Sequence, residues 1–330
     1  MSKIKYSQIR NKIIKTLLKT AEKKGILVRQ IDEDFATFSL QYKDQEHYIW
    51  GKRIGLNNKN SGLVSNKFLT NKLLKEAGVK VPQCFLCRSI EEVKDLIAKK
   101  KIKFPFVLKP FNYSLGLGVT AQITNVKMLN FALQQIKKVW AKSEKRGKRK
   151  RKIFLAEEYI TGNDYRILVL NNQVKAVAMR QLPQIVGNGK NTIRELIIKY
   201  YQEKDKKPKI DKELKRNLQM QKVGLEKIIP KGKIVVLRRT ANIHTGGTSI
   251  NVTTKIHPYY QKIAVKACKK FGLKIAGVDL MTEDISKKSD DYAVIEINSL
   301  PCIAMHQNPD IGQPVPVYEM ILKSIFPHLK

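Results

Sequence analysis

Apolar residues recur at helical spacing in several stretches of the chain. Over residues 3–24 the apolar positions include Ile13, Leu17 and Ala21, which are four residues apart. Gly25 follows and is expected to end the helix. The same spacing predicts helices at residues 66–78, 90–100, 126–143, 192–228 (interrupted by a loop at 204–212), 257–272 and 314–326.

Short runs that alternate or are apolar throughout predict the strands. Residues 26–54 alternate around a turn at Lys43 and Asp44, and a strand is expected after the helix at 66–78. Helices and strands alternate without a strict βαβ period, so we expect an α+β fold. The remaining predicted strands are residues 104–110, 153–159, 164–170, 173–180, 234–237, 274–281 and 292–298.

Composition excludes several classes of protein. The chain has 330 residues, of which 42% are hydrophobic, enough for a sizeable core and against a disordered or fibrous chain. It has no apolar run of the ~18 residues that a membrane helix needs, and no signal-peptide pattern. Four cysteines are too few for a disulfide scaffold. We therefore expect a cytoplasmic protein.

The net charge of +36 would suit a polyanionic partner. Most of this charge is lysine spread along the whole chain, which favours a general lysine bias, and we expect no nucleic-acid partner. The densest basic run, residues 142–152, is expected to form a solvated loop between a helix and a strand, although it could contact an anion.

Three oxygen-bearing side chains lie on two predicted strands near the C-terminus. Glu296 and Asn298 are two apart on one strand and so share a face, and Asp279 from the neighbouring strand could join them. Such an oxygen-only set suits Mg²⁺ that also binds substrate phosphates. The residues alone leave two readings open, a metal site or ordinary polar strand ends.

Two further segments have features of nucleotide binding. Lys109 ends an apolar strand before a loop with Gly116 and Gly118, which would let backbone N–H groups approach a phosphate, although an ordinary glycine turn is the alternative. The acidic strand end at 155–160 could form a nucleotide hinge or a plain hairpin.

Two motifs are less specific. Arg238 and Arg239 precede a loop with small residues and a glycine pair. This arrangement would let an anion approach closely, and an ordinary flexible surface loop is the alternative. Cys84 and Cys87 form a CxxC pair with no second pair, so we expect two ordinary strand residues and no redox or zinc site.

Taken together, these segments resemble the ATP-grasp superfamily of carboxylate–amine ligases, and in particular the ATP-grasp modules of cyanophycin synthetases and bifunctional glutathione synthetases. The resemblance covers roughly residues 60–328. It rests on SNKFLT with AGVKVP, FPFVLKP with the glycine loop, LAEEYITGNDYRILV, QIVGNGKNTIRELI, LRRTANIHTGGTSINVT, IHP, IAGVDLM and VIEINSLPCIAMHQNP, in that order.

The resemblance implies an ATP-grasp fold, in which two α+β subdomains clasp ATP. Residues 1–60 would be a short N-terminal α/β region and 61–330 the ATP-grasp domain, with 103–165 as its small lid subdomain. The family modules with a Mur-ligase-like half or an N-terminal glutamate–cysteine ligase are larger, so we expect this chain to lack those activities.

The resemblance also implies roles for individual residues. The ATP-binding residues would be Lys67, Lys109, Gly116, Gly118, Glu157, Glu158, Tyr159, Ile160, Asp164 and Arg166. Asp279, Glu296 and Asn298 would hold Mg²⁺, with Mn²⁺ as an alternative ion. Arg238, and not Arg239, aligns with the family's arginine, and Arg238 and Asn242 would be catalytic. Residues that would contact substrate are His244, Gly246, Gly247 and His306.

The implied reaction joins a carboxylate to an amine. ATP would phosphorylate the carboxylate to an acyl phosphate, and an amine would displace phosphate to form an amide, with release of ADP. The substrate would be an amino acid or peptide, which the positive field suggests is acidic. A glutathione-synthetase-like ligase and a non-catalytic nucleotide- or polyanion-binding module are the alternatives, and a homo-oligomer stays open.

Overall fold

The structure, a computed structural model, describes the chain except residues 1–3, 5, 10, 33–35, 52, 112, 114–115, 146–150, 209 and 242. It divides into two compact units. The first comprises Met1–Pro82, Ile160–Met179 and Ile250–Lys330, and the second comprises Gln83–Tyr159 and Arg180–Ser249. The domain boundaries drawn from the sequence remain a prediction.

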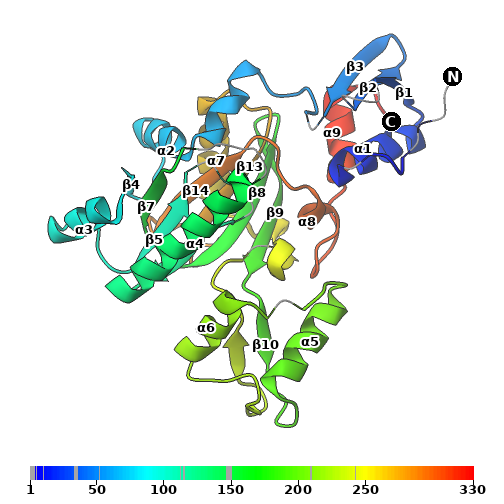
Figure 1. Cartoon of the computed structure of the whole chain (residues 1–330). Helices are drawn as coiled ribbons and strands as arrows, with labels where there is room; N and C mark the ends of the chain where they lie inside the picture. Colours follow the sequence, from blue (N-terminus) through cyan, green and yellow to red (C-terminus); the bar gives the residue numbers. More distant parts are fainter. Residues whose placement is uncertain are drawn as a thin grey trace. The chain divides into compact units, whose positions relative to one another are not determined.

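A five-stranded sheet with the order β12-β9-β8-β13-β14 is the centre of the first unit. Both β8 and β14 pair antiparallel with β13 (Figure 1). The helices and strands of this unit are α1 (Lys12–Lys23), β1 (Leu27–Asp32), β2 (Thr37–Tyr42), β3 (Gln45–Trp50), α2 (Lys67–Glu76), β8 (Asn163–Leu170), β9 (Gln173–Gln181), β12 (Thr248–Asn251), α7 (Pro258–Lys270), β13 (Ile275–Thr282), β14 (Tyr292–Asn298), α8 (Ala304–Gln307) and α9 (Val317–Ile325).

The two faces of this sheet differ in what covers them. On one face, alternate residues such as Ile167 and Val278 pack with α2 and α7 in an apolar core. On the other face, Leu168 and Ile275 pack at one end with α1, α9 and the inner side of the sheet β1-β2-β3. This second core leaves the rest of that face for polar side chains.

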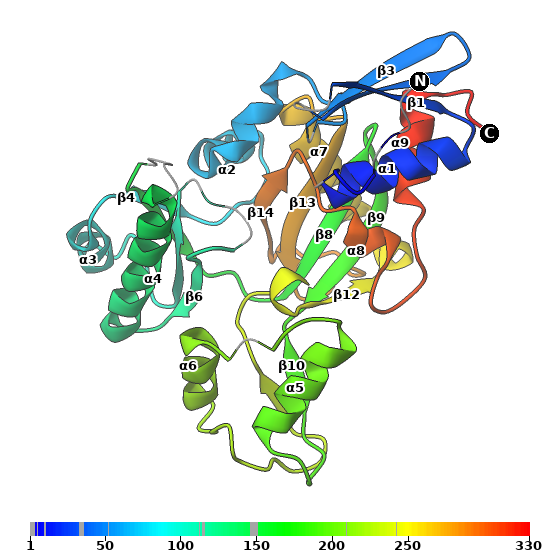
Figure 2. The ribbon, with the colours of Figure 1, turned by 45° about the vertical axis from the view of Figure 1, so that its right-hand side comes forward.

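The second unit contains two smaller α+β bodies. A four-stranded antiparallel sheet of order β4-β7-β5-β6 packs against α3 and α4, and a two-stranded sheet β10-β11 packs with α5 and α6 (Figure 2). A capping box, in which Thr192 and Glu195 bond reciprocally, fixes the start of α5. The elements are β4 (Cys84–Cys87), α3 (Ile90–Ala98), β5 (Phe106–Pro110), β6 (Thr120–Ile123), α4 (Val126–Glu144), β7 (Phe154–Glu158), β10 (Gln184–Val186), α5 (Ile193–Glu203), α6 (Lys212–Met220) and β11 (Ile234–Val236).

The expected α+β class is confirmed, and most predicted elements form. Three expectations about boundaries were wrong. The first helix begins at Lys12, where Asn11 caps it. The expected loop at 204–212 does separate two helices in the region 192–228, but the second helix ends at Met220 and does not reach 228. The helix before the basic run continues to Glu144, so the loop does not begin at Lys142. Residues 146–150 of that run lie outside the described part. The pattern missed the short strands β6, β10 and β12.

Candidate functional site

A row of charged side chains crosses the polar face of the first unit's sheet. Asp279 on β13 lies directly opposite Glu296 on β14 and directly opposite Arg166 on β8. Residues paired across antiparallel strands point to the same face, so these three side chains are neighbours. Asn298 lies two residues beyond Glu296 on the same strand, opposite Gly277. The structure therefore brings the three predicted metal ligands to one face.

Glu296 reaches this face because of a β-bulge. Asp279 and Leu280 are consecutive, yet their partners Glu296 and Val294 are two apart, so Ile295 is an extra residue on β14. Val294 and Ile297 both lie in the apolar core. Without the extra residue, Glu296 would point to the same face as Val294. The bulge thus directs the carboxylate away from the core.

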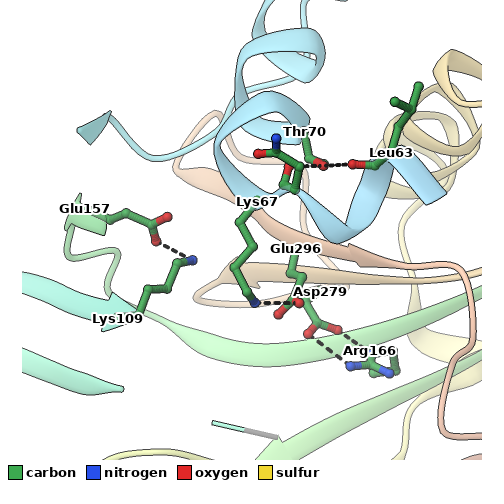
Figure 3. Close-up of polar contacts among 9 residues, drawn as sticks. Leu63, Lys67, Thr70, Lys109, Glu157, Arg166, Asp279 and Glu296 are labelled. Carbon is green, nitrogen blue, oxygen red and sulfur yellow. Dashed lines mark hydrogen bonds and ion pairs between the residues drawn. The ribbon is translucent and has the colours of Figure 1, made fainter. Parts of the chain in front are cut away.

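Cations neutralise both carboxylates of the row. The Arg166 guanidinium donates Nε to Asp279 Oδ1 and Nη2 to Oδ2, the latter at 3.0 Å, and both side chains are only 7% exposed. Lys67 Nζ donates to Glu296 Oε1 at 2.7 Å from the first turn of α2 (Figure 3). Lys67 was predicted to bind ATP phosphate, and sequence reasoning did not foresee its contact with Glu296.

Gly277 gives Arg166 the room to lie along the sheet. A Cβ atom at Gly277 would come within 2.8 Å of Arg166 Cδ and 2.9 Å of Pro301 Cβ. Sequence reasoning missed this glycine, although it stands two residues before Asp279, on the same face of β13. It acts as a positioning residue for the Arg166–Asp279 pair.

The donor set fits a hard divalent ion. Among the residues that the structure describes, no group of three His, Cys, Asp or Glu side chains is arranged to hold a metal. The predicted triad has only two carboxylates, and the amide oxygen of Asn298 would be the third ligand. Mg²⁺ typically takes one or two carboxylates from protein and its other ligands from water and phosphate.

In the second unit, Lys109 and Glu157 form a buried ion pair. Lys109 Nζ lies 2.6 Å from Glu157 Oε2, and the side chains are 8% and 6% exposed (Figure 3). The Cys84 thiol donates to Glu157 Oε1 at 3.4 Å. These residues share the sheet face opposite to the one that packs on α4. Glu157, predicted at the adenine hinge, therefore holds Lys109 in place.

The neighbouring segments have the expected local geometry. Gly116 and Gly118 have φ of +70° and +74°, in the region that favours glycine. At the strand end, Glu158 accepts a hydrogen bond from the backbone N–H of Gln83 at 3.1 Å. Tyr159 and Ile160 follow it and are half-buried.

Cys84 and Cys87 lie on opposite faces of β4, because Cys87 belongs to the core with α4. Both are free thiols. Burial, followed by the Glu157 charge, raises the pKa of Cys84, and burial raises the pKa of Cys87 to about 11. This geometry agrees with two ordinary strand residues.

Arg238 is buried and ion-paired within the second unit. It is 2% exposed, and it donates to Asp211 Oδ2 at 3.0 Å and Glu213 Oε2 at 2.9 Å, at the start of α6. Burial alone would lower the pKa of Arg238, but hydrogen bonds to Asp211 and Tyr201 raise it. Burial raises the pKa of Glu213 despite the nearby Arg238.

The remaining predicted residues are spread over the two units. Asp164 lies at the start of β8 and is half-buried. Gly246 and Gly247 are buried, and Gly246 packs against the Tyr201 ring. His306 is buried in α8 at 2% exposed. Asn242 and the side chain of His244 lie outside the described part of the chain, so their predicted roles stay predictions.

Comparison with known proteins identifies the family of the chain. A family model described as a RimK-like ATP-grasp domain matches residues 64–237 and 237–313. Cyanophycin synthetase from Trichormus variabilis is 29% identical over 328 residues, which cover 94% of this chain and 34% of that protein. The bifunctional glutathione biosynthesis protein GshAB of Clostridium perfringens is 31% identical over 334 residues, 94% of this chain and 40% of that protein.

A crystal structure of a bifunctional glutathione synthetase from Pasteurella multocida matches with a TM-score of 0.66 and 28% identity, over 96% of this chain and 44% of that chain. The fold is thus that of an ATP-grasp protein. More narrowly, the chain belongs to the RimK-like ATP-grasp family. It spans roughly a third to two fifths of the length of the curated relatives described above. In the described part of the chain, no helix has the length and apolar character needed to cross a membrane.

Proposed function

We propose that the chain is an ATP-dependent carboxylate–amine ligase that acts on an amino acid or peptide and releases ADP and phosphate. The observation that carries this proposal is the row of Arg166, Asp279 and Glu296 on one sheet face, in a chain of an ATP-grasp family. Arg166 and Lys67 already supply the cations that these two buried or half-buried carboxylates need. Cation neutralisation is also what phosphoryl transfer from ATP requires.

Asp279, Glu296 and Asn298 would hold Mg²⁺, or Mn²⁺ in its place. When bound, the ion supplies neutralisation of the phosphate charge. Lys67 and Lys109 would place point charges on the phosphates of ATP, and each already bonds a carboxylate that fixes its ammonium group.

The other predicted residues would position the reactants. The loop with Gly116 and Gly118 would approach the phosphates through backbone N–H groups and exclude water. Glu157, Glu158, Tyr159 and Ile160 would contact the nucleoside.

The amide-forming step would take place near Arg238 and Asn242. A substrate carboxylate oxygen attacks the γ-phosphorus and ADP leaves; an amine then attacks the acyl carbon and phosphate leaves. The resemblance gives Arg238 the role of stabilising the oxyanion of that second step, an effect worth about 3 kcal/mol for one donor in comparable sites. To reach substrate, its guanidinium group would have to leave Asp211 and Glu213, which it bonds in this structure. In this proposal, the residues that contact the substrate are His244, Gly246, Gly247 and His306.

Substrate-dependent ADP release tests the proposal. The full chain is incubated with ATP, Mg²⁺ and a panel of amino acids and dipeptides, acidic ones included, and ADP and the amide product are measured. We expect one carboxylate and amine pair to stimulate ADP release. In Asp279→Asn and Glu296→Gln, we expect turnover to fall roughly 100-fold or more, at or beyond the upper end of losses reported around metal ligands. Glu283→Gln, exposed just after β13, is the control.

A glutathione-synthetase-like activity is the narrower alternative, favoured by the likeness to the Pasteurella multocida protein. Amide formation from γ-glutamylcysteine and glycine alone would establish it. Salt-sensitive polyanion binding, with no substrate stimulating ATP consumption, would instead support a non-catalytic module.

A further inference from the structure

The second unit contains a cavity of about 260 Å³. Of the residues that the proposed function assigns to ATP, its lining includes Gly116 and Gly118. Its walls are the loop 116–121, one side of α4, the helix α6, and Arg239 with Thr240. Figure 2 shows α6 next to β6, whose first residues, Thr120 and Ala121, belong to this wall. The predicted ATP lysine of this unit, Lys109, does not line the cavity.

Positive charge dominates the lining. Four cationic side chains, Lys138, Lys142, Arg216 and Arg239, face one carboxylate, Glu213. That carboxylate already accepts a hydrogen bond from Arg238, which is not part of the lining. Within the described part of the chain, none of the four cations forms an ion pair.

Neutral partners hold the two guanidinium groups. Arg216 stacks on the Phe131 ring, 4.2 Å from its centroid, and Arg239 donates Nε to Asn217 Oδ1 at 3.0 Å. Both arginines are half-buried, and burial together with the Arg239 charge lowers the pKa of Arg216, an effect that Glu213 opposes. These guanidinium groups therefore stay close together while retaining N–H groups for another acceptor.

One more donor in the wall has no partner among the residues that the structure describes. It is the side-chain amide nitrogen of Gln135, which is buried. Buried donors are nearly always satisfied in native proteins, and leaving one unpaired is unfavourable. Gln135 and Lys138 are three residues apart on α4, so they share the face that lines the cavity.

We propose that this cavity binds a small oxyanion, with the Gln135 amide and the guanidinium groups of Arg216 and Arg239 as hydrogen-bond donors. Its volume is below the roughly 300–1,000 Å³ of sites for drug-sized ligands. Phosphate, pyrophosphate or an acidic amino-acid side chain fits this chemistry, and a complete nucleotide is too large. Phe131, Val139 and Met220 supply an apolar wall for a carbon skeleton.

Binding without ATP tests this site separately from any ligase activity. Isothermal titration calorimetry of the full chain at low ionic strength uses four probes: inorganic phosphate, pyrophosphate, succinate and the dipeptide Asp-Asp. We expect saturable binding of at least one probe, and a loss of affinity of at least tenfold in Arg239→Gln and in Gln135→Leu. Preference for the phosphates or for the carboxylates then identifies the source of the oxyanion.

Matched controls come from the same helix. Lys137→Gln and Gln134→Leu change exposed neighbours that do not line the cavity, and we expect affinity within twofold of the wild type. Because Arg239 also bonds Asn217, Lys138→Gln, at an exposed lining position, serves as a further variant if Arg239→Gln does not fold, with a measurable loss of affinity expected. Absence of saturable binding by all four probes, or binding that the lining variants leave unchanged, would overturn the proposal.

Discussion

Replacing Gly277 by alanine tests how the charged row on the first sheet is held together. The new methyl group would lie 2.8 Å from Arg166 Cδ, 3.2 Å from Arg166 Nη1 and 2.9 Å from Pro301 Cβ. Separations under 3.0 Å are not tolerated, so Arg166 or the segment at Pro301 must move. Arg166 has little freedom to do so, because two of its nitrogens bond the Asp279 carboxylate.

The size of the effect depends on whether the ion pair survives. If the sheet accommodates the methyl group and the ion pair stays intact, overpacking should lower the free energy of unfolding by about 1–3 kcal/mol. If Arg166 leaves Asp279, a buried carboxylate loses its cation, and the reduction in the free energy of unfolding rises toward about 3–5 kcal/mol. Since a domain of 150–250 residues shifts by roughly 2–4 °C per kcal/mol, we expect the unfolding midpoint to fall by at least about 2 °C.

Two measurements separate positioning from simple destabilisation. Circular dichroism gives the unfolding midpoint, and ATP turnover at a temperature where both proteins are folded gives the Mg²⁺ concentration for half-maximal rate. We expect that concentration to rise about tenfold or more, because second-shell partners orient metal ligands. Gly62→Ala is the matched control, since a Cβ there meets no atom within 4 Å and its φ is not positive. A Gly277→Ala protein with the midpoint and Mg²⁺ dependence of the wild type would refute the role assigned to this glycine.

Three further predictions concern the Lys109–Glu157 ion pair and the two cysteines of the second unit. Lys109→Met should lower the free energy of unfolding by about 3–5 kcal/mol in urea titrations, because Glu157 loses its cation, and adding Glu157→Gln should restore part of that loss; no change in the single variant would contradict the pairing. Because their pKa values are raised, Cys84 and Cys87 should stay protonated at pH 8 and react with iodoacetamide more slowly than a free thiol. Mass spectrometry follows the labelling, and Cys84 should react faster in the Glu157→Gln variant. Since the folded chain holds these thiol protons more tightly than the unfolded chain does, stability should decline as the pH rises above the ordinary thiol pKa of ~8.5; rapid labelling at pH 8 would show that the thiols are not shielded.

The sequence was sufficient where the information is local. Alternation along the strands placed Glu296 and Asn298 on one face, and the adjacent strand with Asp279 was recognised from its apolar run; the pairing of Asp279 with Glu296 confirms that expectation. Helical spacing of apolar residues was enough to place helices such as α2 to within two residues. The family was identified because many modest motifs occur in one order, and the family model confirms it.

What the sequence could not supply depends on residues that are far apart in the chain. Strict alternation in the run Val294 to Asn298 would put Ile295 and Ile297 in the core. Because of the bulge, Val294 takes the place of Ile295 there, and Ile297 stays in the core. A bulge is a property of two strands in register, so one strand's pattern does not reveal it. The fixing of Lys67 by Glu296 is of the same kind, since these residues are 229 positions apart.

The residues that line the oxyanion cavity also could not be predicted from the sequence. The basic run at 142–152 drew attention to charge, but density along the sequence is a poor guide to where cations converge. The cavity takes only Lys142 from that run, and it adds Lys138 one turn earlier on α4 and Arg216 and Arg239 from elements 70 or more positions away. Isolated lysines on a helix face water and release little energy on meeting an anion, whereas half-buried guanidinium groups beside an unpaired amide have already lost part of their hydration. For this reason the structure, and not the charge pattern, selects which of the 64 lysines and arginines can form a site.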